Sequence, residues 1–335
     1  MKAMVLVGGE GTRLRPLTEA VPKPLLPLMN RPFLHHVLDH LAAHGVHEAI
    51  LSSPYLEERF RGFLDSRRGD PVVTWITEKV PLGTSGAVAG ALDHLDDTFL
   101  VLNGDILTDL DLTALVDFHR RREALGTIAL IRVEDVGRFG LVEMQDDGRI
   151  LAFREKAAQL IPGTVNAGTY VLEPAALAQV PRGVMVSIER ETFPGLIAEG
   201  ERLFGFLSDG YWRDLGTPED YLQAHFDALE GKLGREYPRP LLGEGARVAE
   251  DAMVGSMAVL GGGSSVSSGA SVNRSVLHEN ASVREGAVVE GSVLGPGARI
   301  GAGAVVRDSL LASGASAPSG SQLDGARVRP GEVAG

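Results

Sequence analysis

Up to about residue 240, short apolar runs alternate with longer stretches of helical periodicity. The runs predict strands at Ala3–Val7, Ala49–Leu51, Val72–Ile76, Thr98–Leu102 and Thr127–Arg132. The longer stretches predict helices at Pro32–His44, Thr84–Leu92, Leu112–Arg122, Ser187–Glu199 and Pro218–Leu229. Near-continuous apolar strands separated by helices are typical of a largely parallel sheet that helices cover on both faces. The pattern therefore predicts a Rossmann-like α/β layer, in which ligands bind at the carboxyl ends of the strands.

A different period governs the chain after Pro240. Aliphatic residues recur every six positions, with two five-residue steps, and mostly small residues stand between them, at Val248, Val254, Leu260, Val266, Val272, Leu277, Val283, Val289, Leu294, Ile300 and Val306. Six residues with one inward aliphatic form one side of a triangular coil in a left-handed parallel β-helix, and about eleven such units predict three to four coils. A disordered tail would not need phased aliphatics.

Two domains follow from this change of period. We expect an α/β domain at residues 1–235 and a hexapeptide-repeat β-helix at residues 241–330, joined by the linker Pro238-Arg239-Pro240. The length of 335 residues also suits two domains, at about 150 residues per domain. After Pro240 the chain has no Phe, Trp, Tyr or Lys and holds 18 of the 42 glycines, so the second domain is built on small side chains.

Charge and cysteine content exclude several classes of function. The chain has 32 Lys and Arg against 44 Asp and Glu, a formal net charge of −12. A strongly acidic surface repels phosphate backbones, so we expect neither nucleic acid nor an anionic membrane as a partner, and an anionic substrate must meet locally placed cations. With no Cys, a disulfide framework, a thiolate nucleophile and a Cys-ligated metal site are excluded.

The first apolar stretch is too short for export. It spans five residues before Gly8, whereas a signal peptide core needs about 7–15. No run approaches the roughly 18 apolar residues of a membrane span. The segment indicates a buried first strand, and we expect a cytoplasmic protein.

The first strand runs directly into the glycine-rich string Gly8-Gly9-Glu10-Gly11-Thr12-Arg13-Leu14-Arg15-Pro16. Glycines at this place let backbone N–H groups approach anionic oxygens closely. The string is neither a dinucleotide fingerprint, because Leu14 stands five residues after Gly9, nor a Walker loop, because no Gly-Lys-Ser/Thr triplet ends it. The cations Arg13, Arg15 and Lys23, the last fixed between two prolines, suit a polyphosphate tail.

These residues resemble the signature of the sugar-1-phosphate nucleotidyltransferases, and most closely that of the mannose-1-phosphate guanylyltransferases. The resemblance continues through further motifs: Pro22-Lys23-Pro24-Leu25, Pro81-Leu82-Gly83-Thr84-Ser85-Gly86, Leu102-Asn103-Gly104-Asp105, Phe139-Gly140-Leu141-Val142-Glu143, Glu155-Lys156, Asn166-Ala167-Gly168-Thr169-Tyr170 and Trp212-Arg213-Asp214-Leu215-Gly216-Thr217-Pro218. It spans nearly the whole chain, since family members often carry a C-terminal hexapeptide β-helix. The implied reaction is attack by a sugar-1-phosphate oxygen on the α-phosphorus of a nucleoside triphosphate, with release of pyrophosphate.

The resemblance assigns roles to the cations. Arg13 would hold the departing pyrophosphate, Lys23 would stabilise charge at the α-phosphate, and Lys156 would bind the incoming sugar phosphate. Such chemistry depends on neutralising and aligning two polyanions rather than on a nucleophilic side chain. The implied nucleotide-binding set is Leu6, Gly8, Gly9, Gly11, Thr12, Arg13, Glu78, Gly83, Thr84 and Asp105.

Two carboxylates are the candidate metal ligands. Asp105 follows an apolar run and so lies at the carboxyl end of a strand, where it can face a bound phosphate, and Asp214 resembles the family's second metal ligand. Carboxylates, phosphates and water are the ligands that Mg²⁺ prefers. We therefore expect Asp105 and Asp214 to be catalytic and to hold Mg²⁺.

Glu78 stands where the family reads the base. A carboxylate only accepts hydrogen bonds, which suits the adjacent N1–H and N2–H donors of guanine better than uracil or thymine. This favours GTP, although backbone groups near Gly83 are an alternative reader.

The sugar-phosphate site is implied at Gly140, Glu155, Lys156 and Asn166. The carboxylate and the amide suit a polyol. These residue types do not distinguish mannose from glucose, so the prediction of mannose as the sugar comes from the resemblance alone. Ala157 stands where the family usually has Pro.

Two histidine patterns are weaker signals. His36, His40 and His44 are spaced by four, as zinc ligands can be, but a plain helical surface is favoured. The isolated His278 would suit acyl transfer, as in some bifunctional relatives, yet the Lys-free β-helix favours spacing and contacts in a homo-oligomer.

Two alternatives to the leading function stay open. One is a glucose-1-phosphate thymidylyl- or uridylyltransferase. The other is a non-catalytic nucleotide-sugar sensor, which would be expected to lose phosphate or metal groups that are all present here.

Overall fold

The computed structural model describes residues 1–54, 57–95, 97–138, 141–154 and 162–335. Two compact units divide the chain. The first consists of Met1–Gly9 with His36–Trp212, and the second of Glu10–His35 with Arg213–Gly335. The glycine-rich string is thus shared, because Gly8 and Gly9 belong to the first unit and Gly11 to Arg15 belong to the second.

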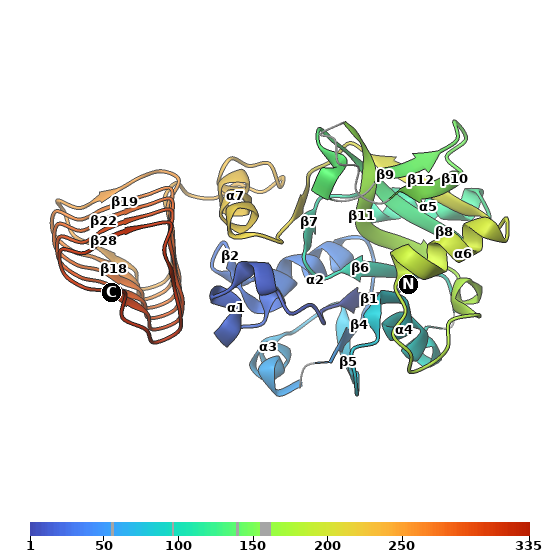
Figure 1. The fold of residues 1–335 in the computed structure, drawn as a ribbon, viewed down its shortest axis with the longest axis horizontal. Helices are drawn as coiled ribbons and strands as arrows, with labels where there is room; N and C mark the ends of the chain where they lie inside the picture. The colour runs from blue at the N-terminus through green and yellow to red at the C-terminus, as the bar shows by residue number, and fades with distance from the viewer. Residues whose placement is uncertain (55–56, 96, 139–140, 155–161) are drawn as a thin grey trace. The chain divides into compact units, whose positions relative to one another are not determined.

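A seven-stranded sheet forms the centre of the first unit (Figure 1). Its order is β12-β8-β11-β6-β1-β4-β5. The strands are β1 (Lys2–Leu6), β4 (Glu48–Ser53), β5 (Val72–Thr77), β6 (Phe99–Asn103), β8 (Gly126–Val133), β11 (Gly163–Leu172) and β12 (Leu203–Ser208). β11 is antiparallel to both neighbours, and the other pairs are parallel. The expected largely parallel, Rossmann-like sheet is confirmed.

Helices and short elements surround this sheet. They are η3 (Glu57–Arg59), α3 (Arg61–Ser66), α4 (Gly83–Gly90), η4 (Leu92–His94), β7 (Ile106–Thr108), α5 (Leu112–Arg121), η5 (Val136–Arg138), β9 (Leu141–Met144), β10 (Ile150–Arg154), η6 (Pro174–Leu177), η7 (Ile188–Thr192) and α6 (Phe193–Ala198). A buried apolar core joins the sheet to α4 and α6, with Met4, Val101 and Leu130 from strands and Val88 and Phe193 from helices. α2 (Phe33–Ala43) and β13 (Trp212–Asp214) each run across a boundary between the units.

The helix expected at Ser187–Glu199 is two elements. The chain first forms the π-helix η7, in which the Thr192 N–H donates to the Ser187 carbonyl at 3.2 Å, and then the α-helix α6. Pro194 stands at this transition and has no N–H to donate, so a regular ladder of hydrogen bonds cannot pass through it.

The second unit combines the N-terminal segment with the C-terminal third of the chain. The segment holds η1 (Thr12–Leu14), α1 (Leu17–Ala20), η2 (Lys23–Leu25), β2 (Pro27–Leu28) and β3 (Arg31–Pro32). α7 (Pro218–Leu229) matches its predicted bounds, and the Thr217 side chain caps its N-terminus by accepting the Asp220 N–H.

Three parallel sheets then form the sides of a left-handed β-helix (Figure 1). The first sheet contains β14 (Leu241–Leu242), β17 (Val259–Leu260), β20 (Val276–Leu277), β23 (Val293–Leu294), β26 (Leu310–Leu311) and β29 (Arg327–Val328). The second contains β15 (Arg247–Val248), β18 (Ser265–Val266), β21 (Ser282–Val283), β24 (Arg299–Ile300) and β27 (Ser316–Ala317). The third contains β16 (Met253–Val254), β19 (Ser271–Asn273), β22 (Val288–Glu290), β25 (Val305–Arg307) and β28 (Gln322–Asp324).

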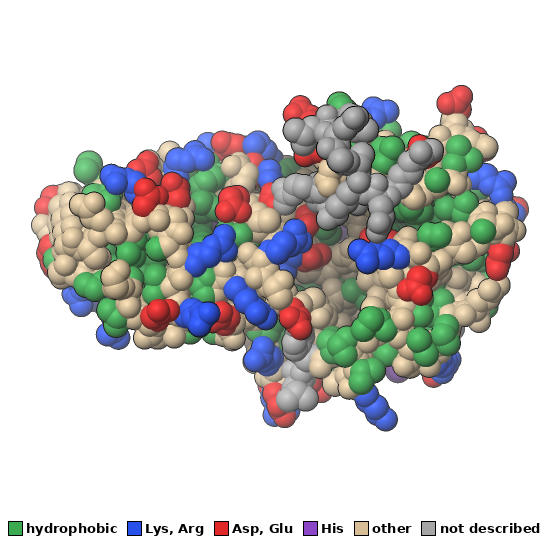
Figure 2. Space-filling model, viewed as in Figure 1, with side chains coloured by type: hydrophobic (Ala, Val, Ile, Leu, Met, Phe, Trp, Pro, Cys, Tyr) green, Lys and Arg blue, Asp and Glu red, His purple; other side chains and the backbone are tan. Residues whose placement is uncertain are grey.

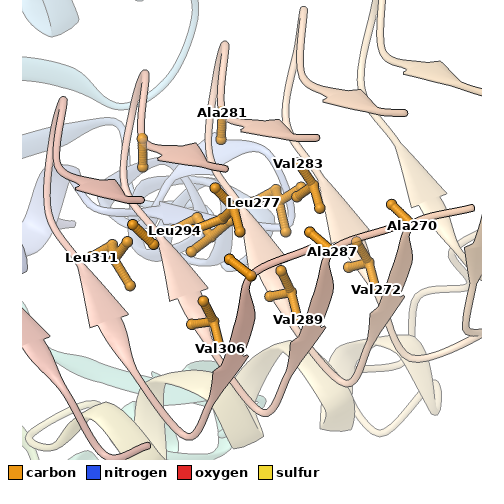
Figure 3. Close-up of a cluster of buried hydrophobic side chains, with 14 of the residues drawn as sticks. Ala270, Val272, Leu277, Ala281, Val283, Ala287, Val289, Leu294, Val306 and Leu311 are labelled. Atoms are coloured by element: carbon orange, nitrogen blue, oxygen red, sulfur yellow. The ribbon is translucent and has the colours of Figure 1, made fainter. Parts of the chain in front are cut away.

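The phased aliphatics from Leu260 to Val306 fill the inside of this β-helix, as predicted, whereas Val248 in the first coil is exposed. Figure 3 shows Leu277, Leu294 and Leu311 stacked in one column and Val272, Val289 and Val306 in another. The expected three to four coils are too few, since the first sheet has six strands. The core continues past Val306 through Leu311, Ala317, Leu323 and Val328, where an alanine replaces one aliphatic and weakens the pattern in the sequence.

A column of buried serines, spaced 17 residues apart, connects neighbouring coils by hydrogen bonds. Each serine N–H donates to the hydroxyl of the serine 17 residues earlier, at 3.1 Å from Ser292 to Ser275 and from Ser309 to Ser292. The hydroxyls donate to carbonyls in their own turns. Buried polar groups are therefore satisfied between coils. On the face seen in Figure 2, acidic and basic side chains are interspersed over the β-helix.

No helix among the described residues is long and apolar enough to cross a membrane.

Candidate functional site

Two glycines of the glycine-rich string, Gly8 and Gly11, are required for steric reasons, whereas a Cβ on Gly9 would meet nothing within 4 Å. A Cβ on Gly8 would lie 2.6 Å from Pro54 Cδ, so the chain passes too close for any side chain. Gly11 has a φ of +60°, and a Cβ there would lie 3.0 Å from Thr18 Cγ2 and 3.2 Å from Lys23 Cβ. Glycine adopts such a left-handed conformation without strain. Gly11 thus lets the string fold tightly against the segment that carries Lys23.

Arg13, Lys23 and Asp214 come together in the second unit. Lys23 Nζ lies 3.8 Å from Asp214 Oδ1, and Arg13 Nη2 lies 3.7 Å from Asp214 Oδ2. The side chains of Lys23 and Asp214 are 8% and 16% exposed, while that of Arg13 is 61% exposed. Two cations therefore share one carboxylate, and the group carries net positive charge that an incoming phosphate can meet.

Gly216 brings the backbone against the guanidinium of Arg13. A Cβ at this glycine would lie 2.6 Å from Arg13 Nη2. The string Trp212-Arg213-Asp214-Leu215-Gly216 thereby supplies both the carboxylate and the close approach. Arg15, the third cation of the predicted group, instead forms an ion pair with Glu10 at 3.6 Å, and Thr12 is exposed at the start of η1.

Asp105 lies beyond the carboxyl end of β6, as the apolar run before it predicts. Leu6 ends the neighbouring strand β1, and its carbonyl accepts the Gly104 N–H at 2.9 Å. The charge of Asp105 helps to raise the pKa values of Tyr170 and Glu189, although burial is the larger cause for both groups. Asp105 therefore belongs to an acidic part of the first unit.

Glu189 is a carboxylate of η7 that the sequence reasoning missed. Asn166 Nδ2 donates to Glu189 Oε1 at 2.7 Å and to the Tyr170 hydroxyl at 2.8 Å. Asn166 Oδ1 accepts the Gly168 N–H at 2.8 Å. The Asn166 amide, expected at a sugar hydroxyl, is thus fixed by Glu189 and its own strand. The sequence predicted one regular helix over residues 187–199 and gave no reason to single out Glu189. The place of Glu189 beside Asn166 depends on how η7 packs.

Glu78 is buried, and both oxygens of its carboxylate accept hydrogen bonds from the protein. Oε1 accepts the Ser52 hydroxyl at 2.8 Å, and Oε2 accepts the Leu82 N–H at 3.0 Å. An ionised carboxylate has about four acceptor positions, so both oxygens retain capacity for a ligand. These contacts fix Glu78 immediately before α4, which begins at Gly83.

Thr84 connects α4 to a distant segment. Its hydroxyl accepts the Ile188 N–H at 2.7 Å, while the Ser85 N–H donates to the Val186 carbonyl at 3.0 Å. The predicted nucleotide-binding residue Thr84, together with Ser85, thus holds the start of η7 in place, and a Cβ on Gly83 would lie 2.7 Å from the Val186 carbonyl oxygen. The predicted residues Gly140, Glu155 and Lys156, and also Ala157, lie outside the described residues.

The donor chemistry of Asp105 and Asp214 fits a hard divalent cation. Both side chains offer carboxylate oxygens, which such cations prefer. Among the described residues no group of three or more His, Cys, Asp or Glu is placed to hold a metal. A cation held by one or two carboxylates together with substrate phosphates and water does not need such a group.

The histidines of α2 are less exposed than a plain helical surface implies. His40 is mostly buried, and burial together with His44 lowers its pKa to about 4. The two rings meet edge to face at 4.9 Å. His44 Nδ1 lies 2.9 Å from the Thr113 hydroxyl. These contacts are those of a packed helix face.

Known proteins resemble the chain over most of its length. Residues 2–231 match the family described as nucleotidyl transferase, and residues 237–332 match the GMPPB C-terminal domain. The mannose-1-phosphate guanylyltransferase of Mycobacterium tuberculosis is 40% identical over 289 residues, which cover 83% of this chain and 79% of that protein. The probable mannose-1-phosphate guanylyltransferase 1 of Oryza sativa subsp. japonica is 36% identical over 274 residues, or 78% and 74% of the two chains.

Solved structures resemble about two thirds of the chain. HddC from Yersinia pseudotuberculosis is 28% identical, and its crystal structures alone and complexed with GMP-PN give TM-scores of 0.60 and 0.59. Each match covers 67% of this chain and 97% of HddC. The family match over residues 2–231, together with relatives at 40% and 36% identity, shows that the chain belongs to the nucleotidyltransferase family.

Proposed function

We propose that the chain transfers GMP from GTP to mannose 1-phosphate, giving GDP-mannose and pyrophosphate. The observation that carries this proposal is the group of Arg13 and Lys23 around Asp214 in the second unit. Two cations held beside the glycine-rich string suit a polyphosphate. Support for guanine and mannose comes from the names of the relatives at 40% and 36% identity and from HddC, which was solved with GMP-PN.

The reaction is a displacement at the α-phosphorus of GTP. A phosphate oxygen of mannose 1-phosphate forms a new bond to this phosphorus, and the bond between it and the α–β bridging oxygen breaks. Pyrophosphate leaves with that oxygen. Negative charge builds up on the α-phosphate and on the leaving group, so preorganised cations accelerate the step.

Lys23 and Arg13 meet that charge at different places. Lys23 is buried and held between Pro22 and Pro24, so its ammonium loses little freedom when it contacts the α-phosphate. Arg13 is the more exposed cation and carries the planar fork that suits the departing pyrophosphate. Lys156 is proposed to bind the sugar phosphate, with Glu155, Gly140 and Asn166 at the sugar.

Nucleotidyltransferases of this family generally use a divalent metal ion. We infer Mg²⁺, held by Asp105 and Asp214, because both offer hard oxygen donors. When bound, it supplies neutralisation of the phosphate charge. The negative charge of Asp214 also compensates the positive charges of Lys23 and Arg13. Its contacts with both side chains hold the two cations together.

The guanine reader is proposed to be Glu78, together with backbone groups near Gly83. Its burial and its fixed hydrogen bonds to Ser52 and Leu82 hold the carboxylate in one orientation, as base recognition requires. Leu6, Gly8, Gly9, Gly11, Thr12 and Thr84 complete the proposed nucleotide site. A homo-oligomer built through the β-helix and a cytoplasmic location remain predictions.

One matrix of reactions tests the proposal. Pyrophosphate release is measured with GTP, UTP, dTTP, ATP and CTP against mannose 1-phosphate and glucose 1-phosphate. We expect GTP with mannose 1-phosphate to give the highest kcat/KM. Highest release with dTTP or UTP and glucose 1-phosphate would favour the thymidylyl- or uridylyltransferase alternative. Absence of release with every pair would favour a nucleotide-sugar sensor.

A further inference from the structure

The side-chain amide of Asn166 on β11 has both of its N–H donors engaged by the protein. Nδ2 donates one hydrogen to the Tyr170 hydroxyl at 2.8 Å and the other to Glu189 Oε1 at 2.7 Å. Oδ1 accepts the Gly168 N–H at 2.8 Å. A side-chain amide has two donors and two acceptor positions. Asn166 thus retains a single acceptor position, and its two donors hold the neighbouring side chains in place.

The contacts of Asn166 and Tyr170 meet on one oxygen of Glu189. Oε1 accepts the Asn166 amide at 2.7 Å and the Tyr170 hydroxyl at 3.3 Å, which fills both of its acceptor positions. Neither bond involves Oε2, and no side chain or backbone group in the described part of the chain donates to that oxygen. Glu189 is an exposed residue. Two side chains therefore orient a carboxylate whose second oxygen is available to a ligand.

The irregular part of β11 that carries Asn166 lies against the carboxyl end of β6. A Cβ on Gly168 would lie 2.8 Å from Asn103 Nδ2, and Asn103 ends β6 two residues before Asp105. Burial, with a smaller effect from the charge of Asp105, raises the pKa of Glu189, so the two carboxylates lie within electrostatic reach of each other. All of these residues belong to the first unit. Ligands of α/β sheets bind beyond the carboxyl ends of the strands.

The charge at this place determines which part of a substrate Glu189 can contact. An ionised carboxylate only accepts hydrogen bonds, so Oε2 pairs with a donor such as a hydroxyl group. A phosphate carries no donor and would be repelled by Glu189 and by Asp105 together. A hydroxyl group is uncharged, and a hydrogen bond to an ionised acceptor is about twice as strong as one between neutral groups. The hydroxyl groups of a sugar therefore suit Oε2 better than the phosphates do.

We propose that Glu189 is a specificity-determining residue for the sugar, whose Oε2 accepts a hydrogen bond from one hydroxyl group of mannose 1-phosphate. Asn166 and Tyr170 are positioning residues that hold this carboxylate. The inference rests on the proposed transfer reaction and adds to its sugar site a residue that no local sequence pattern indicated. The site then requires an unsubstituted hydroxyl at one position of the sugar, and the KM for GTP does not depend on Glu189.

Deoxy sugars combined with one variant identify the contact. Glu189→Gln keeps the size of the side chain and an oxygen for Asn166, but it puts an amide nitrogen in place of Oε2. We expect this variant to lower kcat/KM for mannose 1-phosphate about 10- to 100-fold, because a hydrogen bond to a charged acceptor is lost. With one of the 2-, 3-, 4- and 6-deoxy forms, which already lacks the hydroxyl in question, wild type and variant should have similar kcat/KM.

The same set of rates contains the results that would contradict the contact. An equal loss with mannose 1-phosphate and with all four deoxy sugars would overturn it, because a merely structural role affects every sugar alike. A higher KM for GTP, or a higher Mg²⁺ concentration at half-maximal rate, would place Glu189 at the nucleotide or the metal and overturn its assignment to the sugar. Absence of transfer from GTP to mannose 1-phosphate by the wild type would instead refute the proposed reaction.

Glu191→Gln is the matched control. Glu191 lies on the same element η7, is exposed, and its Oε1 accepts the Ser187 N–H at 2.8 Å. We expect its rates with all five sugars to equal those of the wild type.

A crystal structure of the wild type with mannose 1-phosphate decides the proposal where Glu189→Gln does not fold. We expect one sugar hydroxyl within about 3 Å of Glu189 Oε2. A bound sugar with every hydroxyl beyond hydrogen-bond distance of Glu189 would overturn the contact.

Discussion

Lys23 Nζ lies 3.8 Å from Asp214 Oδ1, although the two residues are far apart in the sequence and the lysine side chain is only 8% exposed. A buried ammonium is costly unless an anion compensates it. Asp214 supplies that anion and also approaches Arg13 on its other oxygen. The carboxylate thus lies beside both cations, and a metal-binding role for it is proposed in addition.

Asp214→Asn is expected to lower kcat on the order of 100-fold or more. The amide keeps the size of the side chain but removes the charge that balances Lys23 and that would hold Mg²⁺. Steady-state rates of pyrophosphate release, with circular dichroism as a check of the fold, measure the effect. Asp209→Asn, an exposed aspartate shortly before β13, is the control. A near-wild-type rate at saturating Mg²⁺ would remove Asp214 from the site.

Lys23→Met is expected to lower kcat by about 100- to 1,000-fold with a smaller change in KM. Methionine fills a similar volume in the buried position, so the loss reports the charge that meets the transition state. Full kinetic curves with GTP separate the two constants. The exposed Lys79→Met should leave both constants unchanged. A change in KM alone would mean that Lys23 binds the substrate without assisting the step.

Asp105→Asn is expected to raise the Mg²⁺ concentration needed for half-maximal rate and to lower kcat on the order of 100-fold. An amide is a weaker ligand than a carboxylate for a hard cation. Rates measured over a Mg²⁺ titration at saturating GTP test this, with the exposed Asp146→Asn as control. An unchanged titration would assign Asp105 a role apart from the metal.

The β-helix was the part of the fold that the sequence predicted best. One inward side chain every six residues is a local property, so Leu277, Val283 and Val289 reveal it without knowledge of their neighbours in space. The coil count was too low because Ala317 interrupts the aliphatic pattern while still filling the core. A small residue such as Ala317 can fill the core of a coil and yet be hard to recognise as an inward-facing position in the sequence.

Contacts across long sequence separations were harder to predict. β11 was missed because Asn166 and Gly168 break its apolar run, and the strand has an irregular register at that place. Glu189 was missed because only the packing of η7 brings it within 2.7 Å of Asn166. The resemblance assigned separate roles to Arg13, Lys23 and Asp214, but no local pattern predicts that the two cations pair with this carboxylate.

Glu78→Gln is expected to reduce the preference for GTP over UTP. The side-chain amide puts a donor where a carboxylate oxygen accepted hydrogen bonds, and it also leaves either Ser52 or Leu82 without its acceptor. The ratio of kcat/KM for the two triphosphates measures the preference. Ser52→Ala removes one hydrogen bond to Glu78 and keeps the carboxylate. We expect it to lower the free energy of unfolding while leaving the GTP/UTP ratio of kcat/KM nearly unchanged. A GTP/UTP ratio unchanged in Glu78→Gln would refute the assignment.

His40 is expected to make the protein less stable as the pH falls below about 6.5. Its pKa is lowered to about 4 in the folded chain, mainly by burial, so the unfolded chain binds the proton more readily between these two values. Stability that is complete above pH 6.5 is then lost progressively, by about 2 kcal/mol between pH 7 and pH 5. Urea unfolding at both pH values should show a loss about 2 kcal/mol larger in the wild type and in His94→Gln, an exposed control, than in His40→Gln, because His278, whose pKa burial lowers to about 3, adds a loss of its own in all three proteins. An equal pH dependence in all three proteins would mean that His40 takes up its proton in the folded state as easily as in the unfolded chain.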